Sequence, residues 1–118
     1  MGKVFMIDDD ESIRHKYKER FANSDLELIE ADDALSATEV LMREKSNIDL
    51  ILLDLQLPEI DGRAIYDIIE DYASNIPVIV TSVLPIEDQK LRIPRATDYF
   101  NKSEGSRVLI SKIKKLLG

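Results

Sequence analysis

The chain has 118 residues, of which 44% are hydrophobic and 33% are charged, so we expect one compact domain spanning residues 1–118. The net charge of −7 argues against direct nucleic acid binding, because contacts to phosphates need clustered Lys and Arg. The absence of cysteine excludes disulfides and thiolate metal sites, and no apolar stretch approaches the roughly 20 residues that span a membrane, which together favour a cytoplasmic protein.

The chain alternates between short apolar runs, typical of buried parallel strands, and segments with helical periodicity. The first helical segment carries Ile13, Tyr17 and Phe21 on one face, and Asp10 is a suitable N-cap for it. Asp32 or Asp33 can open the second helix. In chain order we expect a strand over 3–7, a helix over 11–21, a strand over 26–30, a helix over 33–45, a strand over 49–53, a helix over 62–72, strands over 78–81 and 97–100, and a helix over 107–117.

The helical pattern fails only between the last two expected strands. Pro85 and Pro94 bracket residues 86–93, which leaves room for about two helical turns, because proline is tolerated in a first turn but not in a helix interior. We therefore expect a shortened or irregular fourth helix. Strand and helix alternating five times predict an α/β fold with a parallel sheet and helices on both faces.

Acidic residues follow two of the predicted strands. Asp8, Asp9 and Asp10 come after the first strand, and Asp54 comes after the third, which is the most apolar. Open α/β sheets bind ligands at the carboxyl ends of their strands. Two carboxylates about 4 Å apart repel by roughly 4 kcal/mol at an effective dielectric constant near 20. A hard divalent cation offsets this repulsion, so the sequence predicts an Mg²⁺ site at this edge.

A flavodoxin-like strand order of 2-1-3-4-5 would make the first, third, fourth and fifth strands neighbours. The residues at their carboxyl ends would then meet at one edge of the sheet: Asp8 and Asp9, Asp54, Thr81 or Ser82, and Lys102. Two or three carboxylates, one hydroxyl and one ammonium would share a site.

With these residues in this order, the whole chain resembles the receiver domains of two-component response regulators. Four motifs carry the resemblance: residues 4–10 (VFMIDDD), residues 49–62 (DLILLDLQLPEIDG), residues 77–82 (PVIVTS) and residues 96–102 (ATDYFNK). The second motif resembles the phosphoacceptor signature of the family, with Pro58 four residues after Asp54 and the Asp61-Gly62 pair beyond it.

The resemblance implies a phosphoacceptor of a two-component phosphorelay. Asp54 would take a phosphoryl group from a phosphohistidine of a sensor histidine kinase or phosphotransfer protein, forming an aspartyl-phosphate. A downstream effector protein would read the modified state. Such a domain is a signalling phosphoacceptor rather than an enzyme, because it catalyses only its own phosphorylation and dephosphorylation.

The resemblance also implies a role for each site residue. Asp9 would bind Mg²⁺ directly, together with Asp54 and the backbone carbonyl of Gln56, and Asp8 would act mainly through a bound water. Lys102 would hold a phosphoryl oxygen and neutralise developing charge.

Two further residues resemble the switch residues of the family. Counting from Pro77 favours Ser82 over Thr81 as the hydroxyl that binds the phosphoryl group and repositions when it arrives. Tyr99 corresponds to the switch aromatic, although a tyrosine at this position fits a plain core role equally well. His15 lies off the apolar face of the first helix, where a solvated side chain is expected.

The chain departs from the family in three places. Ser103 stands where proline usually follows the lysine, and a cis bond before a non-proline residue costs about 2.5–4 kcal/mol, so a trans, rearranged loop is expected around Lys102. Arg95 replaces a common glycine, and the segment from Ser82 to Tyr99 is short. These departures motivate an alternative function, a degenerate receiver that docks a partner without phosphorylation.

Two other functions are weaker alternatives. A haloacid-dehalogenase-type phosphatase needs a second aspartate two residues after the nucleophile, where this chain has Gln56. A nucleotide-binding fold needs a glycine-rich loop after the first strand, which is absent. The sequence leaves open whether the receiver stands alone or belongs to a longer regulator.

Overall fold

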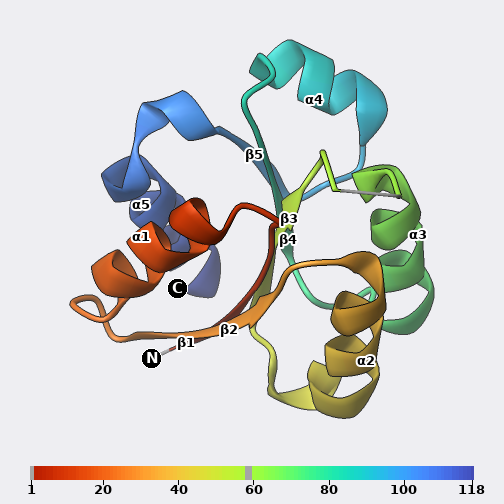
Figure 1. Cartoon of the computed structure of the whole chain (residues 1–118), viewed down its shortest axis with the longest axis horizontal. Helices are drawn as coiled ribbons and strands as arrows, with labels where there is room; N and C mark the ends of the chain where they lie inside the picture. Colours follow the sequence, from red (N-terminus) through yellow and green to blue (C-terminus); the bar gives the residue numbers. More distant parts are fainter. Residues whose placement is uncertain (1, 58–59) are drawn as a thin grey trace.

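The five apolar runs form one parallel sheet, shown in Figure 1, whose strand order is β2-β1-β3-β4-β5. The computed structural model describes residues 2–57 and 60–118, so Pro58 of the predicted signature lies outside the described residues. The strands are β1 (Gly2–Ile7), β2 (Leu26–Ala31), β3 (Leu50–Asp54), β4 (Val78–Ser82) and β5 (Asp98–Asn101). The predicted fold class and strand order are confirmed.

Helices cover both faces of this sheet, with α1 and α5 on one side and α2 and α3 on the other (Figure 1). The α-helices are α1 (Glu11–Phe21), α2 (Ala34–Glu44), α3 (Gly62–Tyr72), α4 (Ile86–Arg92) and α5 (Ser106–Leu117), and two short 3₁₀ turns are η1 (Lys45–Asn47) and η2 (Lys102–Glu104). Among the described residues, no helix is both long and apolar enough to cross a bilayer.

Side-chain caps determine where the first helices begin. The carboxylate of Asp10 accepts the backbone N–H groups of Ser12 and Ile13, as the sequence predicts. Of the two candidates for the second helix, Asp33 is the N-cap, and its carboxylate accepts the N–H of Ser36. These caps fix the loops that leave the carboxyl ends of β1 and β2.

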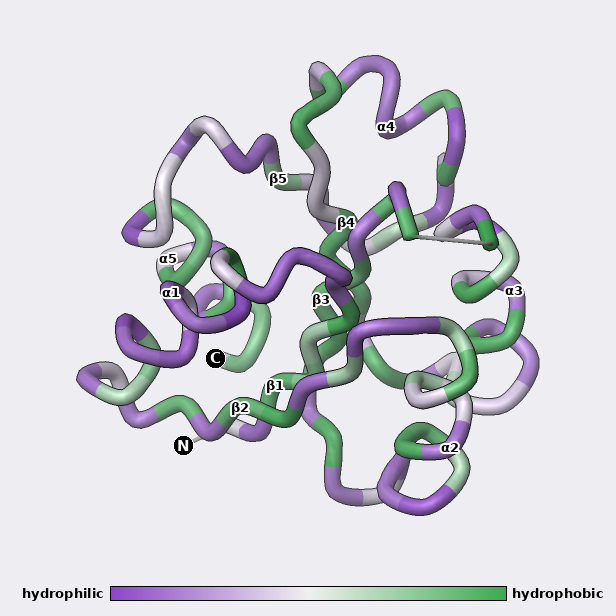
Figure 2. The backbone as a smooth tube through the Cα atoms, viewed as in Figure 1, coloured by the Kyte–Doolittle hydropathy of each residue, from purple (hydrophilic) through white to green (hydrophobic). Residues whose placement is uncertain are grey.

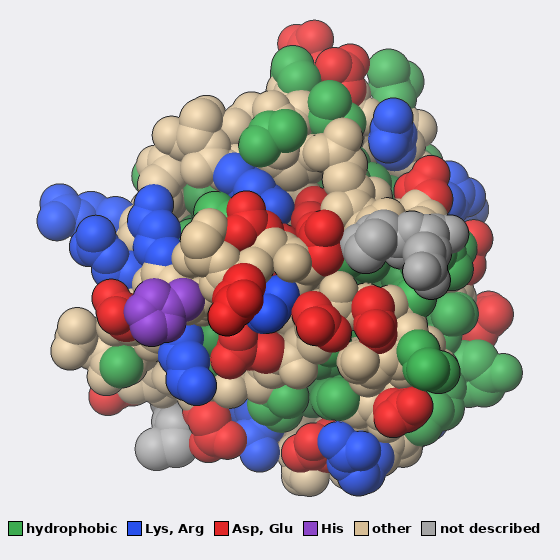
Figure 3. Space-filling model, viewed as in Figure 1, with side chains coloured by type: hydrophobic (Ala, Val, Ile, Leu, Met, Phe, Trp, Pro, Cys, Tyr) green, Lys and Arg blue, Asp and Glu red, His purple; other side chains and the backbone are tan. Residues whose placement is uncertain are grey.

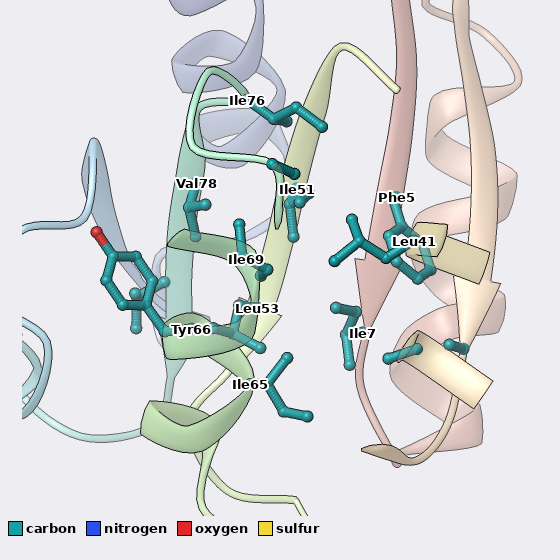
Figure 4. Packing of buried hydrophobic residues seen from close by; sticks show 14 of the residues in the cluster. Phe5, Ile7, Leu41, Ile51, Leu53, Ile65, Tyr66, Ile69, Ile76 and Val78 are labelled. Atoms are coloured by element: carbon teal, nitrogen blue, oxygen red, sulfur yellow. The ribbon is translucent and has the colours of Figure 1, made fainter. Parts of the chain in front are cut away.

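The three inner strands, β1, β3 and β4, are almost fully buried because helices cover both faces of the sheet. In β1, Phe5 and Ile7 pack into the cluster that includes α2 and α3, whereas Val4 and Met6 pack into the cluster with α1 and α5. Figure 4 shows part of the first cluster, in which Ile65 and Ile69 of α3 lie beside the labelled strand residues. Figure 2 shows the same arrangement, with hydrophobic residues concentrated in the central strands.

The fourth helix is short, as predicted. It has seven residues and begins after Pro85, which makes no side-chain cap. Ile93 is fully buried at its end, but Leu91 is 81% exposed and does not anchor the helix. Gln89 is the one residue within α4 that is buried. This helix is therefore anchored to the protein by few apolar contacts.

Candidate functional site

Carboxylates meet at the carboxyl edge of the sheet. Asp8 directly follows β1 and Asp54 ends β3, and both are buried, while Asp9 beside them is exposed. Each of the three offers a carboxylate oxygen, and these oxygens all lie within 4.8 Å of one another. Figure 3 shows acidic side chains gathered over the middle of this face. The strand order thus produces the predicted acidic cluster. A cation would offset the repulsion between its carboxylates.

Lys102 supplies a cation to this cluster. Its Nζ atom lies 2.8 Å from Oδ2 of Asp8 and 3.4 Å from Oδ2 of Asp54, and only 12% of its side chain is exposed. Burial lowers the pKa of Lys102, but the hydrogen bond to Asp8 and the charges of both aspartates outweigh it, so the net pKa is raised. The ammonium is therefore held in its charged form.

The peptide bond between Lys102 and Ser103 is trans, as expected from the serine. No peptide bond in the described chain is cis. The side chain of Asn101 accepts hydrogen bonds from the backbone N–H of Ser103 (2.9 Å) and from its hydroxyl (2.7 Å). Glu104 accepts the N–H of Asn101 at 3.0 Å, which completes a capping box around η2. Lys102 thus reaches the site from a capped 3₁₀ turn.

The carboxyl group of Asp54 has a raised pKa. Burial and the neighbouring charge of Asp8 raise its pKa to about 7, while Lys102 and the N–H of Gln56, which donates to Oδ1 at 3.1 Å, act in the opposite direction. Without a further cation, Asp54 is therefore partly protonated near neutral pH. A cation beside it would favour the carboxylate, which is the nucleophilic form.

The two hydroxyl candidates differ in their surroundings. Ser82 is fully buried as the last residue of β4, and its Oγ accepts the backbone N–H of Leu84 at 3.1 Å. Thr81 is also buried and is the register partner of Asp54. No hydrogen bond in the described part of the chain joins either hydroxyl to Asp54, so the preference for Ser82 stays a prediction.

The ring of Tyr99 is buried, and its hydroxyl donates a hydrogen bond to the backbone carbonyl of Ile93. Nζ of Lys90 on α4 lies 5.8 Å from the centre of the ring. Tyr99 therefore connects β5 to the end of α4. This position suits both the core role and the switch role that the sequence left open.

A comparison with known families decides the relationship of the chain. The model of the response regulator receiver domain matches residues 4–114. The chain belongs to this family.

The receiver domain is similar in sequence to parts of longer regulators. It is 34% identical over 82 residues to the two-component response regulator-like protein APRR9 of Arabidopsis thaliana, covering 68% of this chain and 18% of that protein. It is 28% identical over 118 residues to the transcriptional regulatory protein SrrA of Staphylococcus aureus, covering 98% of this chain and 48% of SrrA. The receiver domain thus spans less than half the length of these curated relatives.

Solved receiver structures resemble this one over nearly the whole chain. The response regulator TrrA of Thermotoga maritima, solved in complex with Mg²⁺-BeF, is 26% identical and superposes with a TM-score of 0.87, covering 98% of this chain and 99% of TrrA. The receiver domain of the Francisella response regulator 1452 is 27% identical and superposes with a TM-score of 0.88, covering 99% of this chain and 97% of that domain.

The receiver domain also uses residues that the sequence analysis did not single out. The guanidinium of Arg14 donates to the backbone carbonyl of Asp8 at 2.7 Å and forms an ion pair with Glu30 at 3.3 Å. It ties the acidic loop after β1 to β2. An arginine one turn into the first helix carries no distinctive sequence signal. His15, by contrast, is exposed and paired with Glu19, as expected for a solvated side chain.

Gly62 stands at a position that has no room for a side chain. A Cβ atom at this position would lie 2.7 Å from the carbonyl oxygen of Asp54 and 2.8 Å from the Cα atom of Leu55. The N–H of Gly62 also donates to the carbonyl of Leu55 at 3.0 Å. The start of α3 therefore packs directly on the backbone that carries Asp54.

Proposed function

We propose that this receiver, acting as one unit over residues 1–118, accepts a phosphoryl group on Asp54. The observation that carries the proposal is the position of Asp54 at the end of β3, beside Asp8 and Asp9 and 3.4 Å from the ammonium of Lys102. The donor is a phosphohistidine on a sensor histidine kinase or phosphotransfer protein. An oxygen of Asp54 forms a bond to phosphorus while the bond from phosphorus to the imidazole nitrogen breaks.

We propose that Mg²⁺ binds beside Asp54, and the donor set supports this. Three carboxylate oxygens within 4.8 Å of one another suit a hard cation that prefers oxygen ligands. Asp9, Asp54 and the carbonyl of Gln56 would hold the ion directly, with Asp8 acting through water. The bound ion would neutralise charge on the phosphoryl oxygens and on the carboxylates.

The residues of the chain then have distinct roles. Lys102 stabilises negative charge on the phosphoryl group, and its position beside Asp54 means that little reorganisation is needed. Ser82 uses its oxygen to accept the N–H of Leu84, so its hydroxyl hydrogen serves as the donor to the phosphoryl group. Tyr99 senses the rearrangement of the loop after Ser82.

The domain acts as a cytoplasmic signalling phosphoacceptor rather than an enzyme. It catalyses only its own phosphorylation and dephosphorylation, and a downstream effector protein reads the result. The lengths of APRR9 and SrrA beyond the matched region support an effector outside the receiver. The receiver itself carries a net charge of −7, which supports a protein partner over direct nucleic acid binding.

The proposal is tested by incubating the protein with acetyl phosphate and Mg²⁺ and measuring its intact mass. The wild-type protein should gain one phosphoryl group, and Asp54→Asn should gain none. Asp67→Asn, which removes an exposed carboxylate on α3, is the matched control and should label like the wild type. Stoichiometric labelling of Asp54→Asn would refute the assignment. No labelling of the wild type would favour the phosphorylation-independent docking function.

A further inference from the structure

One backbone carbonyl connects the loop of Lys102 to α4. The carbonyl oxygen of Leu84, in the segment between β4 and α4, accepts two side-chain amides. Nε2 of Gln89, on α4, donates at 2.9 Å, and Nδ2 of Asn101, at the end of β5, donates at 3.1 Å. We call this set of three residues the Leu84 junction: Leu84, Gln89 and Asn101. Asn101 directly precedes Lys102, so the junction lies next to the candidate site.

Gln89 is placed so that its amide, not its hydrocarbon part, attaches α4 to the sheet. Its side chain is fully buried, and Nε2 also donates to the carbonyl of Phe100 in β5 at 3.1 Å. Because both neighbours are carbonyls, the orientation of the amide is fixed. Oε1 has no partner among the described residues, which is costly for a buried oxygen. A leucine of similar size would avoid this cost, so the two donated bonds account for the glutamine.

Asn101 serves both the junction and the Lys102 loop. Its Nδ2 donates to Leu84, while its Oδ1 accepts the N–H and the hydroxyl of Ser103. A displacement of the Leu84 carbonyl therefore acts on the same amide that caps the 3₁₀ turn carrying Lys102. No apolar contact is needed for this connection.

We propose that the Leu84 junction couples α4 to the Lys102 loop, so that the two segments open and close together. The backbone N–H of Leu84 donates to Ser82, and this hydrogen bond links the junction to the site. The link through Ser82 rests on the proposed function, because it transmits a phosphoryl signal only if Ser82 binds a phosphoryl group. The coupling between α4 and the Lys102 loop does not depend on it.

The coupling is tested first by a double-mutant cycle with Gln89→Leu and Asn101→Asp, measured by urea unfolding without metal or phosphoryl donor. Asn101→Asp retains an acceptor for the cap and removes the donor to Leu84. Each single variant leaves the Leu84 carbonyl with one donor, whereas the double variant leaves it with none.

We expect the unfolding constant of the double variant to differ from the product of the single effects by at least about twofold. Independent effects would overturn the junction. Gln89→Leu combined with Ser111→Ala, at an exposed position on α5, is the control pair and should show independence.

Amide hydrogen exchange on the single variants tests the coupling without the double variant. Asn101→Asp should speed exchange in α4 by at least about twofold, and Gln89→Leu should do the same in residues 101–105. Leu91→Ala, at an exposed position of α4, should leave residues 101–105 unchanged. Effects confined to the mutated segment would overturn the proposal. If these cross effects appear while Asp54 fails to label, the junction stands and the proposed function falls.

The link through Ser82 is tested by hydrogen exchange on the phosphorylated protein. Acetyl phosphate and Mg²⁺ should change exchange in residues 84–95 of the wild-type protein, and this change should be reduced in Asn101→Asp, provided that both proteins reach the same labelled mass. A change of equal size in both proteins would overturn the transmission of the signal through the junction.

Discussion

The ammonium of Lys102 lies 2.8 Å from a carboxylate oxygen of Asp8, which is the shortest ion pair among the described residues. Both side chains are largely buried, so the attraction between them is weakly screened. Removing one partner of such a pair leaves an uncompensated buried charge. Lys102 therefore acts as the resident cation of the acidic cluster. Its loss should affect both the phosphorylation of Asp54 and the charge balance of the buried carboxylates.

Lys102→Met should slow labelling of Asp54 by acetyl phosphate by about 10²-fold, the usual loss when one preorganised charge-stabilising group is removed. Methionine keeps an unbranched stem and removes the ammonium. The rate of mass gain at fixed Mg²⁺ measures the effect. Lys112→Met is the control, because Lys112 of α5 pairs with Asp98 of β5 at 3.5 Å, and both side chains are only partly buried. Equal slowing in both variants would contradict the assigned role.

The stability of the metal-free protein should fall as the pH rises from about 4 to about 7. The pKa of Asp54 is raised from 3.8 to about 7, so in this range the folded state binds more protons than the unfolded state. The loss should be on the order of a few kcal/mol. Urea unfolding in the presence of a chelator measures it. Asp54→Asn should be less sensitive to pH over the same range, and an unchanged pH dependence would rule out Asp54 as its source.

Mg²⁺ should stabilise the folded protein, because a ligand that binds only the folded state shifts the equilibrium by mass action. Millimolar Mg²⁺ should raise the melting temperature by several degrees. Asp54→Asn should raise the melting temperature without metal, since it relieves repulsion with Asp8, and should respond less to the ion. Thermal unfolding with and without Mg²⁺ checks both. If neither shift appears, the carboxylates do not form a cation site.

Asp9 and Asp10 should separate metal binding from helix capping. Asp9→Ala should weaken Mg²⁺ binding and change stability little, because Asp9 is exposed and part of the acidic cluster. Asp10→Ala should cost about 1 kcal/mol of stability, since its carboxylate caps α1 through Ser12 and Ile13, and should leave Mg²⁺ binding largely intact. Titration of Mg²⁺ and urea unfolding of each variant give the comparison. A larger loss of Mg²⁺ affinity in Asp10→Ala would reverse the assignment.

Tyr99→Phe should destabilise the protein by about 1–3 kcal/mol, because the buried carbonyl of Ile93 loses its donor. It should also reduce the change in α4 on phosphorylation, if Tyr99 is a switch residue. Tyr66→Phe is the control, since the hydroxyl of Tyr66 also lies near a backbone carbonyl, that of Arg95 at 2.9 Å, and shares its hydrogen with Glu70 at 2.7 Å. Hydrogen exchange in α4 distinguishes the two variants. Identical behaviour would assign Tyr99 to the core alone.

The sequence predicts most of the fold because its signals are local. Apolar runs bounded by polar residues mark the five strands, and the predicted helix over 11–21 matches α1 because Asp10 is an effective N-cap. The second helix extends only over Ala34–Glu44, one residue shorter at each end than predicted, because Asp33 caps it and Lys45 begins a 3₁₀ turn. The order of the strands comes from the flavodoxin-like pattern rather than from any local signal.

The candidate site is predictable only in part. The acidic cluster follows from the strand ends, but the position of Lys102 depends on a capping box between Asn101 and Glu104, a local spacing that the sequence analysis did not use. Arg14 and Gln89 escaped notice because both donate to backbone carbonyls, which any residue can supply. Their roles appear only when distant segments are brought together.

The ion pair between Asp8 and Lys102 joins residues from opposite ends of the sequence. Within the sheet, Asp8 follows the strand that is synthesised first, and Lys102 follows the strand that is synthesised last. A nascent chain that has not yet added β5 to the sheet carries Asp8 and Asp54 without their resident cation. The acidic cluster thus gains its resident cation only when β5 has joined the sheet, so acceptance of a phosphoryl group, as proposed, would report that the sheet has assembled.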